Sequence, residues 1–166
     1  EILGTTDRPL PFELAELAGP PLSNALFAES PPPYDLGEGK WLVGGREVDR
    51  LPDGLAEGDP YRLSGYLDGR AYAADAQDFG DWYDLDQVLG LLNAMAIDRA
   101  AATRLVVLPT GDQTACVLAA PRTAILAGVS SGLLELGNSD GARAAGQSFE
   151  AAVLEKLETG ELEIDP

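Results

Sequence analysis

The dipeptide Asp68-Gly69 constrains the fold most, because it separates two segments of equal length, Tyr61–Leu67 and Arg70–Ala76. Asp-Gly favours the type I′ turn, whose two central residues both take positive φ and which joins antiparallel strands directly. A two-residue loop pairs residue 67 with residue 70, and this pairing fixes all the others. The sequence therefore predicts a β-hairpin of known register.

The register of this hairpin sorts its side chains onto two faces, since successive residues of a strand point to opposite sides. One face is the expected core face, on which the ring of Tyr72 would cover Gly65. The other face sets Arg62 opposite Asp75, which predicts a cross-strand ion pair. The expected core face carries Tyr61, Leu63, Gly65, Leu67, Tyr72 and Ala74.

Local signals predict further helices and hairpins along the chain. Asp84 suits the N-cap of a helix that runs to residue 98, and Gln87 follows three residues later, as in a capping box. Gly44-Gly45 and Gly111-Asp112 predict two more hairpin turns, which join residues 41–43 to 46–48 and 104–108 to 113–120. Other helices are expected over residues 12–18, 22–28, 121–136 and 149–158.

This order of elements predicts the fold class. Hairpins require antiparallel pairing, so the domain is expected to be α+β rather than a doubly wound α/β fold. We expect a single antiparallel or mixed sheet of about four to six strands, built from hairpins, with helices mainly on one face. Prolines predict an irregular segment over residues 1–40, with short helices and a linker. A single domain over 41–160 and a frayed acidic tail over 161–166 would follow.

The chain contains no histidine and a single cysteine, Cys116. This composition excludes Ser-His-Asp and Cys-His catalysis, His-ligated metals, and any CxxC motif or internal disulfide. Cys116 falls in an apolar strand, where we expect a buried and inert thiol. No catalytic residue, metal-ligand set or cofactor motif is predicted, so the protein is not expected to be an enzyme.

The balance of charges restricts the partners. The chain of 166 residues carries 28 acidic and 11 basic side chains, for a net charge of −17. Such a charge repels phosphates and anionic lipids, so neither nucleic acid nor membrane is an expected partner. The absence of a disulfide framework favours the cytoplasm. The chain begins at Glu1, which is compatible with a removed signal peptide.

The stretch from residue 75 to residue 86 holds five carboxylates and three aromatic side chains. It is open to three interpretations. It could be a calcium loop, although its spacing departs from that of an EF-hand. It could be structural, with aromatics over the core and acids in water. It could bind a protein, with aromatic anchors and aspartates that steer a basic partner. The residues that would then contact the partner are Asp75, Asp78, Phe79, Asp81, Trp82, Tyr83 and Asp86.

The function expected from these observations is that of a non-catalytic acidic module that binds a basic protein, such as a toxin or a nuclease. Dense carboxylates accept hydrogen bonds from the Arg and Lys side chains that a nuclease uses to hold phosphates. Immunity proteins of bacterial toxin systems share this compact, acidic composition, but no motif assigns the chain to a family. The alternatives are a carboxylate-dependent metal enzyme, a small-ligand binder, or an accessory domain of a longer protein.

Overall fold

A computed structural model describes residues 10–43, 46–56, 59–77, 83–110, 114–141, 144, 146–148 and 151–152. Contacts within the chain divide it into two compact units, Glu1–Arg104 and Leu105–Pro166. The domain limits expected from the sequence, at residues 40/41 and 160/161, stay predictions.

The expected α+β class is confirmed, but the expected single sheet of four to six strands is wrong. Among the residues that the structure describes, the strands form three small antiparallel sheets. They are β1 (Leu26–Ser30) with β5 (Tyr61–Leu67) and β6 (Arg70–Ala76), β2 (Tyr34–Gly37) with β3 (Lys40–Val43) and β4 (Arg46–Val48), and β7 (Thr103–Leu108) with β8 (Cys116–Pro121). Proline explains part of this separation, because it cannot donate a hydrogen bond to a ladder. Pro31–Pro33 lie between β1 and β2, and Pro52 and Pro60 lie between β4 and β5.

The first sheet, which we call the covered sheet, confirms the predicted hairpin. Leu67 pairs with Arg70, Gly65 with Tyr72, and every intervening residue follows in the expected register. Asp68 has φ 49° and Gly69 has φ 76°, as the type I′ turn requires. The sheet consists of β1 (Leu26–Ser30), β5 (Tyr61–Leu67) and β6 (Arg70–Ala76).

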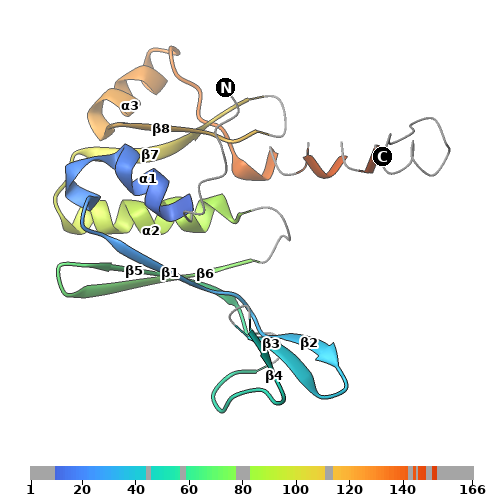
Figure 1. Cartoon of the computed structure of the whole chain (residues 1–166). Coiled ribbons are helices and arrows are strands. Elements are labelled where there is room, and N and C mark those ends of the chain that lie inside the picture. Colours follow the sequence, from blue (N-terminus) through green and yellow to red (C-terminus); the bar gives the residue numbers. More distant parts are fainter. Residues whose placement is uncertain are drawn as a thin grey trace, which may run out of the picture. The chain divides into compact units, whose positions relative to one another are not determined.

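Two helices pack on one face of the covered sheet (Figure 1). The carboxylate of Asp84 accepts a hydrogen bond from the backbone N–H of Gln87, which confirms the predicted N-cap. The other carboxylate oxygen of Asp84 accepts from the N–H of Gln77, directly after β6, at 3.0 Å. The helices are α1 (Leu10–Ala18) and α2 (Leu85–Asp98), with the short 3₁₀ helix η1 (Pro20–Leu22) after α1. The most deeply buried side chains between helices and sheet include Leu22, Leu63, Val88, Leu92 and Met95.

Gly65 illustrates how closely the helices approach the covered sheet. A Cβ atom at this position would lie 2.8 Å from Sδ of Met95 and 3.5 Å from the ring of Phe27. Gly65 pairs with Tyr72 as expected, but the three atoms nearest to that Cβ position belong to Met95 and Phe27 rather than to the ring of Tyr72. Met95 of α2 fills the space above the glycine, so a larger residue here would displace the end of the Met95 side chain.

Strand β1 replaces a helix that was expected over residues 22–28. The expected helix over 12–18 is confirmed as α1, but the chain after η1 becomes a strand and pairs with the edge of β5. Phe27 packs edge-on against Phe12 of α1, with ring centroids 5.0 Å apart. Pairing with β5 and packing against α1 thus override the local helical pattern, because tertiary contacts outweigh weak propensities.

The second sheet, which we call the exposed sheet, has no buried residue among those described. Val43 pairs with Arg46, which confirms the predicted hairpin, although Gly44-Gly45 lie outside the described residues. A strand that the sequence did not predict, β2, pairs with β3 through a bulge. The exposed sheet consists of β2 (Tyr34–Gly37), β3 (Lys40–Val43) and β4 (Arg46–Val48).

The described part of the second unit includes most of the predicted third hairpin and the helix that follows it directly. The paired strands are β7 (Thr103–Leu108) and β8 (Cys116–Pro121), and α3 (Arg122–Ser130) follows directly. Gly137 donates its N–H to the carbonyl of Val107 at 2.8 Å, and a Cβ atom on Gly137 would overlap the backbone carbonyl of Leu108. Gly137 therefore lies against the end of β7, where no other residue fits.

Two expectations in this unit are wrong. Helix α3 ends at Ser130 instead of continuing to residue 136, because Gly132 adopts φ 72° and the N–H of Leu133 returns to the carbonyl of Gly128. This is the Schellman motif, which terminates helices at a glycine. Cys116 is exposed instead of buried, as the first residue of β8. The helix expected over residues 149–158 lies mostly outside the described residues.

Candidate functional site

The structure describes three of the seven residues that we predicted to bind a partner. Asp75, Tyr83 and Asp86 are exposed, and they lie at the end of β6, before the N-cap of α2 and in its first turn. All three therefore belong to the part of the chain that leads from the covered sheet into α2. The remaining predicted residues, Asp78, Phe79, Asp81 and Trp82, lie outside the described residues.

Asp75 already has a partner within the chain. Its carboxylate accepts a hydrogen bond from Nε of Arg62 at 2.8 Å, as the register predicted, and both side chains are about half exposed. The pair lies on the outer face of the covered sheet, opposite the helices. An external basic group would have to compete with Arg62 for this carboxylate.

The hydroxyl of Tyr83 interacts electrostatically with two carboxylates that the sequence did not connect with it. Burial raises the pKa of its hydroxyl, and the negative charges of Glu29 and Glu13 raise it further, while a hydrogen bond from the backbone of Leu10 lowers it. Glu29 belongs to β1 and accepts a hydrogen bond from the hydroxyl of Tyr61 on β5. The β1–β5 pairing brings Glu29 and Tyr61 together across 32 residues, so no local signal in the sequence could have found this contact.

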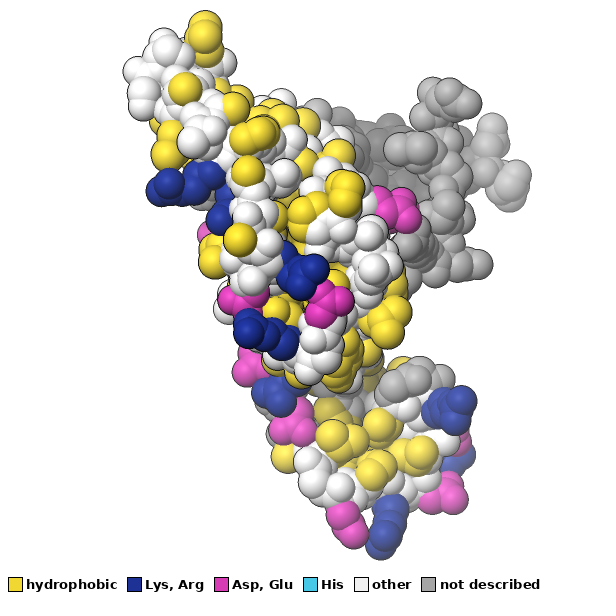
Figure 2. Space-filling model, turned by 90° about the vertical axis from the view of Figure 1, so that its left-hand side faces the viewer, with side chains coloured by type: hydrophobic (Ala, Val, Ile, Leu, Met, Phe, Trp, Pro, Cys, Tyr) yellow, Lys and Arg dark blue, Asp and Glu magenta, His cyan; other side chains and the backbone are white. Residues whose placement is uncertain are grey.

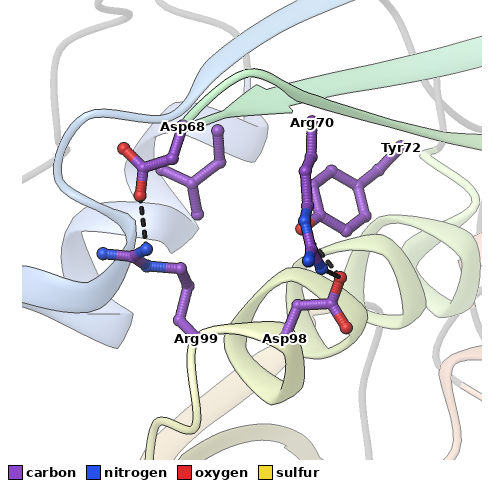
Figure 3. A pocket seen from close by; sticks show the side chains of 6 residues that line it. Asp68, Arg70, Tyr72, Asp98 and Arg99 are labelled. Atoms are coloured by element: carbon purple, nitrogen blue, oxygen red, sulfur yellow. Dashed lines mark hydrogen bonds and ion pairs between the residues drawn. The ribbon is translucent and has the colours of Figure 1, made fainter.

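A second polar cluster joins the β5–β6 turn to the end of α2 (Figure 3). Nη1 of Arg70 and the hydroxyl of Tyr72 both donate to Oδ2 of Asp98, at 2.8 and 3.0 Å. Nη1 of Arg99 lies 2.6 Å from Oδ2 of Asp68. The two groups face each other across a shallow hollow of about 140 Å³.

The charges of this cluster indicate a clamp rather than an acid–base site. Hydrogen bonds from Tyr72 and Arg70 hold the pKa of Asp98 below its ordinary value. Burial raises the pKa of the Tyr72 hydroxyl, as does its bond to Asp98. At neutral pH Asp98 is therefore ionised and Tyr72 protonated, whereas a general acid or base works best with a pKa near the operating pH. Arg70 and Arg99 also place cations near the C-terminal end of a helix, where its dipole favours them.

A larger hollow, of about 340 Å³, lies where the chain leaves β1 and returns to β5. Its walls include Pro31, Pro33 and Pro60, and Asp59 and Arg62 supply its charged groups. The carboxylate of Asp59 accepts a hydrogen bond from the N–H of Ala56, so it is held in place by its own loop. The charges of this hollow thus largely balance within the chain.

The exposed sheet presents hydrophobic side chains to solvent. The register places Tyr34 opposite Leu42 on one face, and these side chains are 66% and 38% exposed. Lys40 and Glu47 form an ion pair on the same face. In Figure 2 the lower lobe, which carries β2, β3 and β4 in Figure 1, shows hydrophobic side chains bordered by basic and acidic ones. Hydrophobic patches with a polar rim are typical of protein-binding surfaces.

None of the helices in the described part of the chain is long and apolar enough to cross a lipid bilayer. Within the same residues, no group of three or more Asp, Glu or Cys side chains is placed to hold a metal ion.

Comparisons of the chain with protein-family models, curated proteins and solved structures found no match.

Proposed function

We propose that the protein is a non-catalytic acidic module that binds a basic protein partner. The observation that carries this proposal is the exposed sheet, on which Tyr34 and Leu42 remain in solvent. Burying such side chains in a complex is favourable by about 25 cal/mol per Å² of apolar surface. A three-stranded sheet that leaves its hydrophobic residues exposed is well suited to receive a second protein.

The net charge supports a basic partner. Lys40, Arg62, Arg70 and Arg99 each contact a carboxylate of the same chain, so their charges are balanced locally. The excess of carboxylates that gives the net charge of −17 then sets the long-range field. A field of one sign attracts a partner of the opposite sign and speeds association. A toxin or a nuclease with a phosphate-binding surface is a partner of this kind.

The acidic and aromatic stretch before α2 is the second part of the proposed surface. Trp and Tyr side chains are frequent anchors of protein interfaces, and aspartates around them accept hydrogen bonds from Arg and Lys. Exposed Tyr83 and Asp86 are consistent with this role. The residues proposed for partner binding remain Asp75, Asp78, Phe79, Asp81, Trp82, Tyr83 and Asp86.

The experiment compares two surface variants with a matched control. The partner is first captured from the source lysate with the wild-type chain, identified by mass spectrometry and purified. Tyr34→Ser with Leu42→Ser tests the exposed sheet, and Asp78→Asn with Asp81→Asn and Trp82→Ala tests the stretch before α2. The control is Leu126→Ser, which removes another exposed hydrophobic side chain, on α3.

Both surface variants should lose affinity for the purified partner while the control binds as the wild type does, with circular dichroism verifying that each variant folds. The association rate should fall about tenfold or more between about 50 and about 500 mM salt, because salt screens long-range attraction. Partner binding that is insensitive to salt, or equal in all variants, contradicts the proposal. A rise in melting temperature with millimolar Ca²⁺ or Mg²⁺ would favour the metal-dependent alternative instead.

A further inference from the structure

The hollow of about 340 Å³ between the end of β1 and the start of β5 has the volume and the lining of a binding site. Pockets that hold small ligands measure about 300–1,000 Å³ and combine hydrophobic walls with a few polar groups. The hydrophobic wall here consists of three prolines and Leu55, which is 40% exposed, and the polar groups belong to Asp59 and Arg62. We call this site the proline hollow, after Pro31, Pro33 and Pro60.

The walls of the proline hollow are stiff, because the ring of each proline fixes its φ angle. Pro31 directly follows β1 and Pro60 directly precedes β5, so both adjoin the ladder in which Ser30 pairs with Arg62. Pro33 is buried and directly precedes β2. Walls held in this way need little ordering when a ligand enters, which lowers the entropic cost of binding.

Two opposite charges on the wall restrict the charge of the ligand. Asp59 and Arg62 lie close enough to interact electrostatically. A cation in the hollow would be repelled by Arg62, and an anion would be repelled by Asp59. The proline hollow therefore suits a group without net charge.

Both charged side chains can still form hydrogen bonds with a ligand. Oδ2 of Asp59 accepts from the N–H of Ala56 at 2.8 Å, while Oδ1 accepts no hydrogen bond from the described residues. Nε of Arg62 donates to Asp75, and the guanidinium carries further N–H groups. Asp59 is only partly buried and Arg62 is exposed, so a group in the hollow has access to both.

The proline rings indicate the hydrophobic part of the ligand. Prolines and aromatic rings pack well together, as when proline-rich peptides bind to grooves lined by aromatic side chains. In this protein the prolines line the hollow, so the aromatic ring would belong to the ligand. A donor on the edge of that ring would bind the open oxygen of Asp59, since carboxylates accept strong hydrogen bonds. The side chains of tryptophan and tyrosine combine such a ring with such a donor.

We propose that the proline hollow binds a tryptophan or tyrosine side chain of the partner protein, with the ring against the prolines and its N–H or O–H donating to Asp59. The assignment of this side chain to a protein rests on the proposed function. Trp and Tyr are among the residues that contribute most to protein interfaces, where they fill pockets of the other protein. Pro33 is followed by Tyr34 of the exposed sheet, so the hollow extends the proposed surface.

The test uses small probes in place of the partner. N-acetyl-tryptophan amide is titrated into the full chain, and the NMR chemical shifts of Leu55, Asp59 and Arg62 are followed. N-acetyl-leucine amide is a control without an aromatic ring, and the derivative methylated on the indole nitrogen is a control without the donor. The tryptophan probe should saturate these shifts in the millimolar range. The leucine probe should bind at least about tenfold more weakly, and the methylated probe at least about threefold more weakly.

Two variants and two matched controls test the walls. Leu55→Ser and Asp59→Asn should each weaken binding of the tryptophan probe at least about threefold. Leu36→Ser changes an exposed leucine of β2, and Asp53→Asn changes an exposed aspartate between β4 and β5. Neither control residue lines the hollow, so both should bind as the wild type does.

Circular dichroism verifies that each variant folds, and Asp59→Asn keeps the test decisive if Leu55→Ser does not. Equal binding of the tryptophan and leucine probes, or unchanged binding by the folded wall variants, overturns the proposal. Equal binding of the methylated probe overturns the hydrogen bond to Asp59.

The probes also separate this proposal from the broader one. If the tryptophan probe binds in the proline hollow but no basic protein binds the chain, the hollow stands as an aromatic site and the proposed function falls. If a basic protein binds with the expected salt dependence but Leu55→Ser does not weaken it and the probe does not bind, the proposed function stands and the proline hollow falls.

Discussion

The covered sheet and the exposed sheet start from similar local chemistry and reach different degrees of burial. In both, two residues of the sequence separate a pair of antiparallel strands, Asp68-Gly69 between Leu67 and Arg70 in one and Gly44-Gly45 between Val43 and Arg46 in the other. Helices α1 and α2 pack on the covered sheet, whereas every described residue of the exposed sheet retains solvent contact. Turn chemistry therefore sets the pairing of strands, while a covering layer supplies most of the stability.

The difference in burial decides which sheet keeps hydrophobic residues accessible to another protein. A sheet that is covered by its own helices has no hydrophobic face left for a partner on that side. A sheet without such cover keeps its hydrophobic residues accessible, at the expense of stability. Under the proposed function, the two sheets would divide the tasks of stability and recognition between them, and the following substitutions test that division.

The largest difference in the free energy of unfolding should be seen when leucine is replaced by alanine over the covered sheet and on the exposed sheet. Leu92 of α2 is fully buried over the covered sheet, and Leu42 of the exposed sheet is 38% exposed. Leu92→Ala should lower the free energy of unfolding by about 2–5 kcal/mol, because it leaves a cavity. Leu42→Ala should lower it by about 0.5 kcal/mol, as surface substitutions do. Equal losses in urea unfolding would remove the distinction between the two sheets.

A pair of glycine substitutions tests how tightly α2 packs on the covered sheet. Gly65→Ala forces Met95 to move, since the new Cβ would lie 2.8 Å from its sulfur, and should destabilise the protein by about 1–3 kcal/mol. Gly90→Ala, in the same helix as Met95, meets nothing within 4 Å and should stabilise it by about 0.5–1 kcal/mol. Thermal unfolding measures both. Changes of the same sign would contradict the close approach of the layers.

Acid should weaken the covered sheet through Asp98. Its pKa is lowered in the folded protein, so its contribution to stability is complete above the unfolded value of about 3.9. That contribution is lost as the pH falls through the lower, folded value. Asp98→Asn should make the acid limb of the stability curve shallower, and Tyr72→Phe, which removes one of two hydrogen bonds, should lie between. Identical curves for the three proteins would show that the clamp carries no stability.

The smallest effect should be that of the ion pair on the exposed sheet. A double-mutant cycle on Lys40 and Glu47 should give a coupling energy of about 0.2–1 kcal/mol, because both side chains are about half exposed. High salt should reduce this coupling. A coupling well above this range would mean that the exposed sheet is stabilised by charge in place of a core.

Features that depend on neighbouring residues could be predicted from the sequence. Asp68-Gly69 encodes both the turn and the register, and Asp84 with Gln87 encodes the start of α2. The Arg62–Asp75 ion pair follows from that register alone. Each of these signals lies within a few residues along the chain or across one tight turn.

Features that depend on distant pairing could not be predicted. The local sequence of residues 26–30 does not predict a strand, because this strand forms through its hydrogen bonds to β5. The contact of Glu29 with Tyr61 spans 32 residues, and that of Arg70 with Asp98 spans 28. The separation of the described strands into three sheets likewise depends on which strand edges pair with each other in the folded chain. The sequence located one stretch of the proposed surface and did not reveal the exposed sheet as another.

The pairing of Ser30 with Arg62 has a consequence for how such a chain can change. Both ends of the segment 31–61 stand on the same rung of one ladder, so topologically the exposed sheet is an insertion in a hairpin made of β1 and β5. The entropy of closing a loop grows only with the logarithm of its length. Residues can therefore be added, removed or exchanged within this insertion while β1 and β5 keep their pairing. An insertion of this kind would let the proposed recognition surface change while the core between the helices and the covered sheet stays the same.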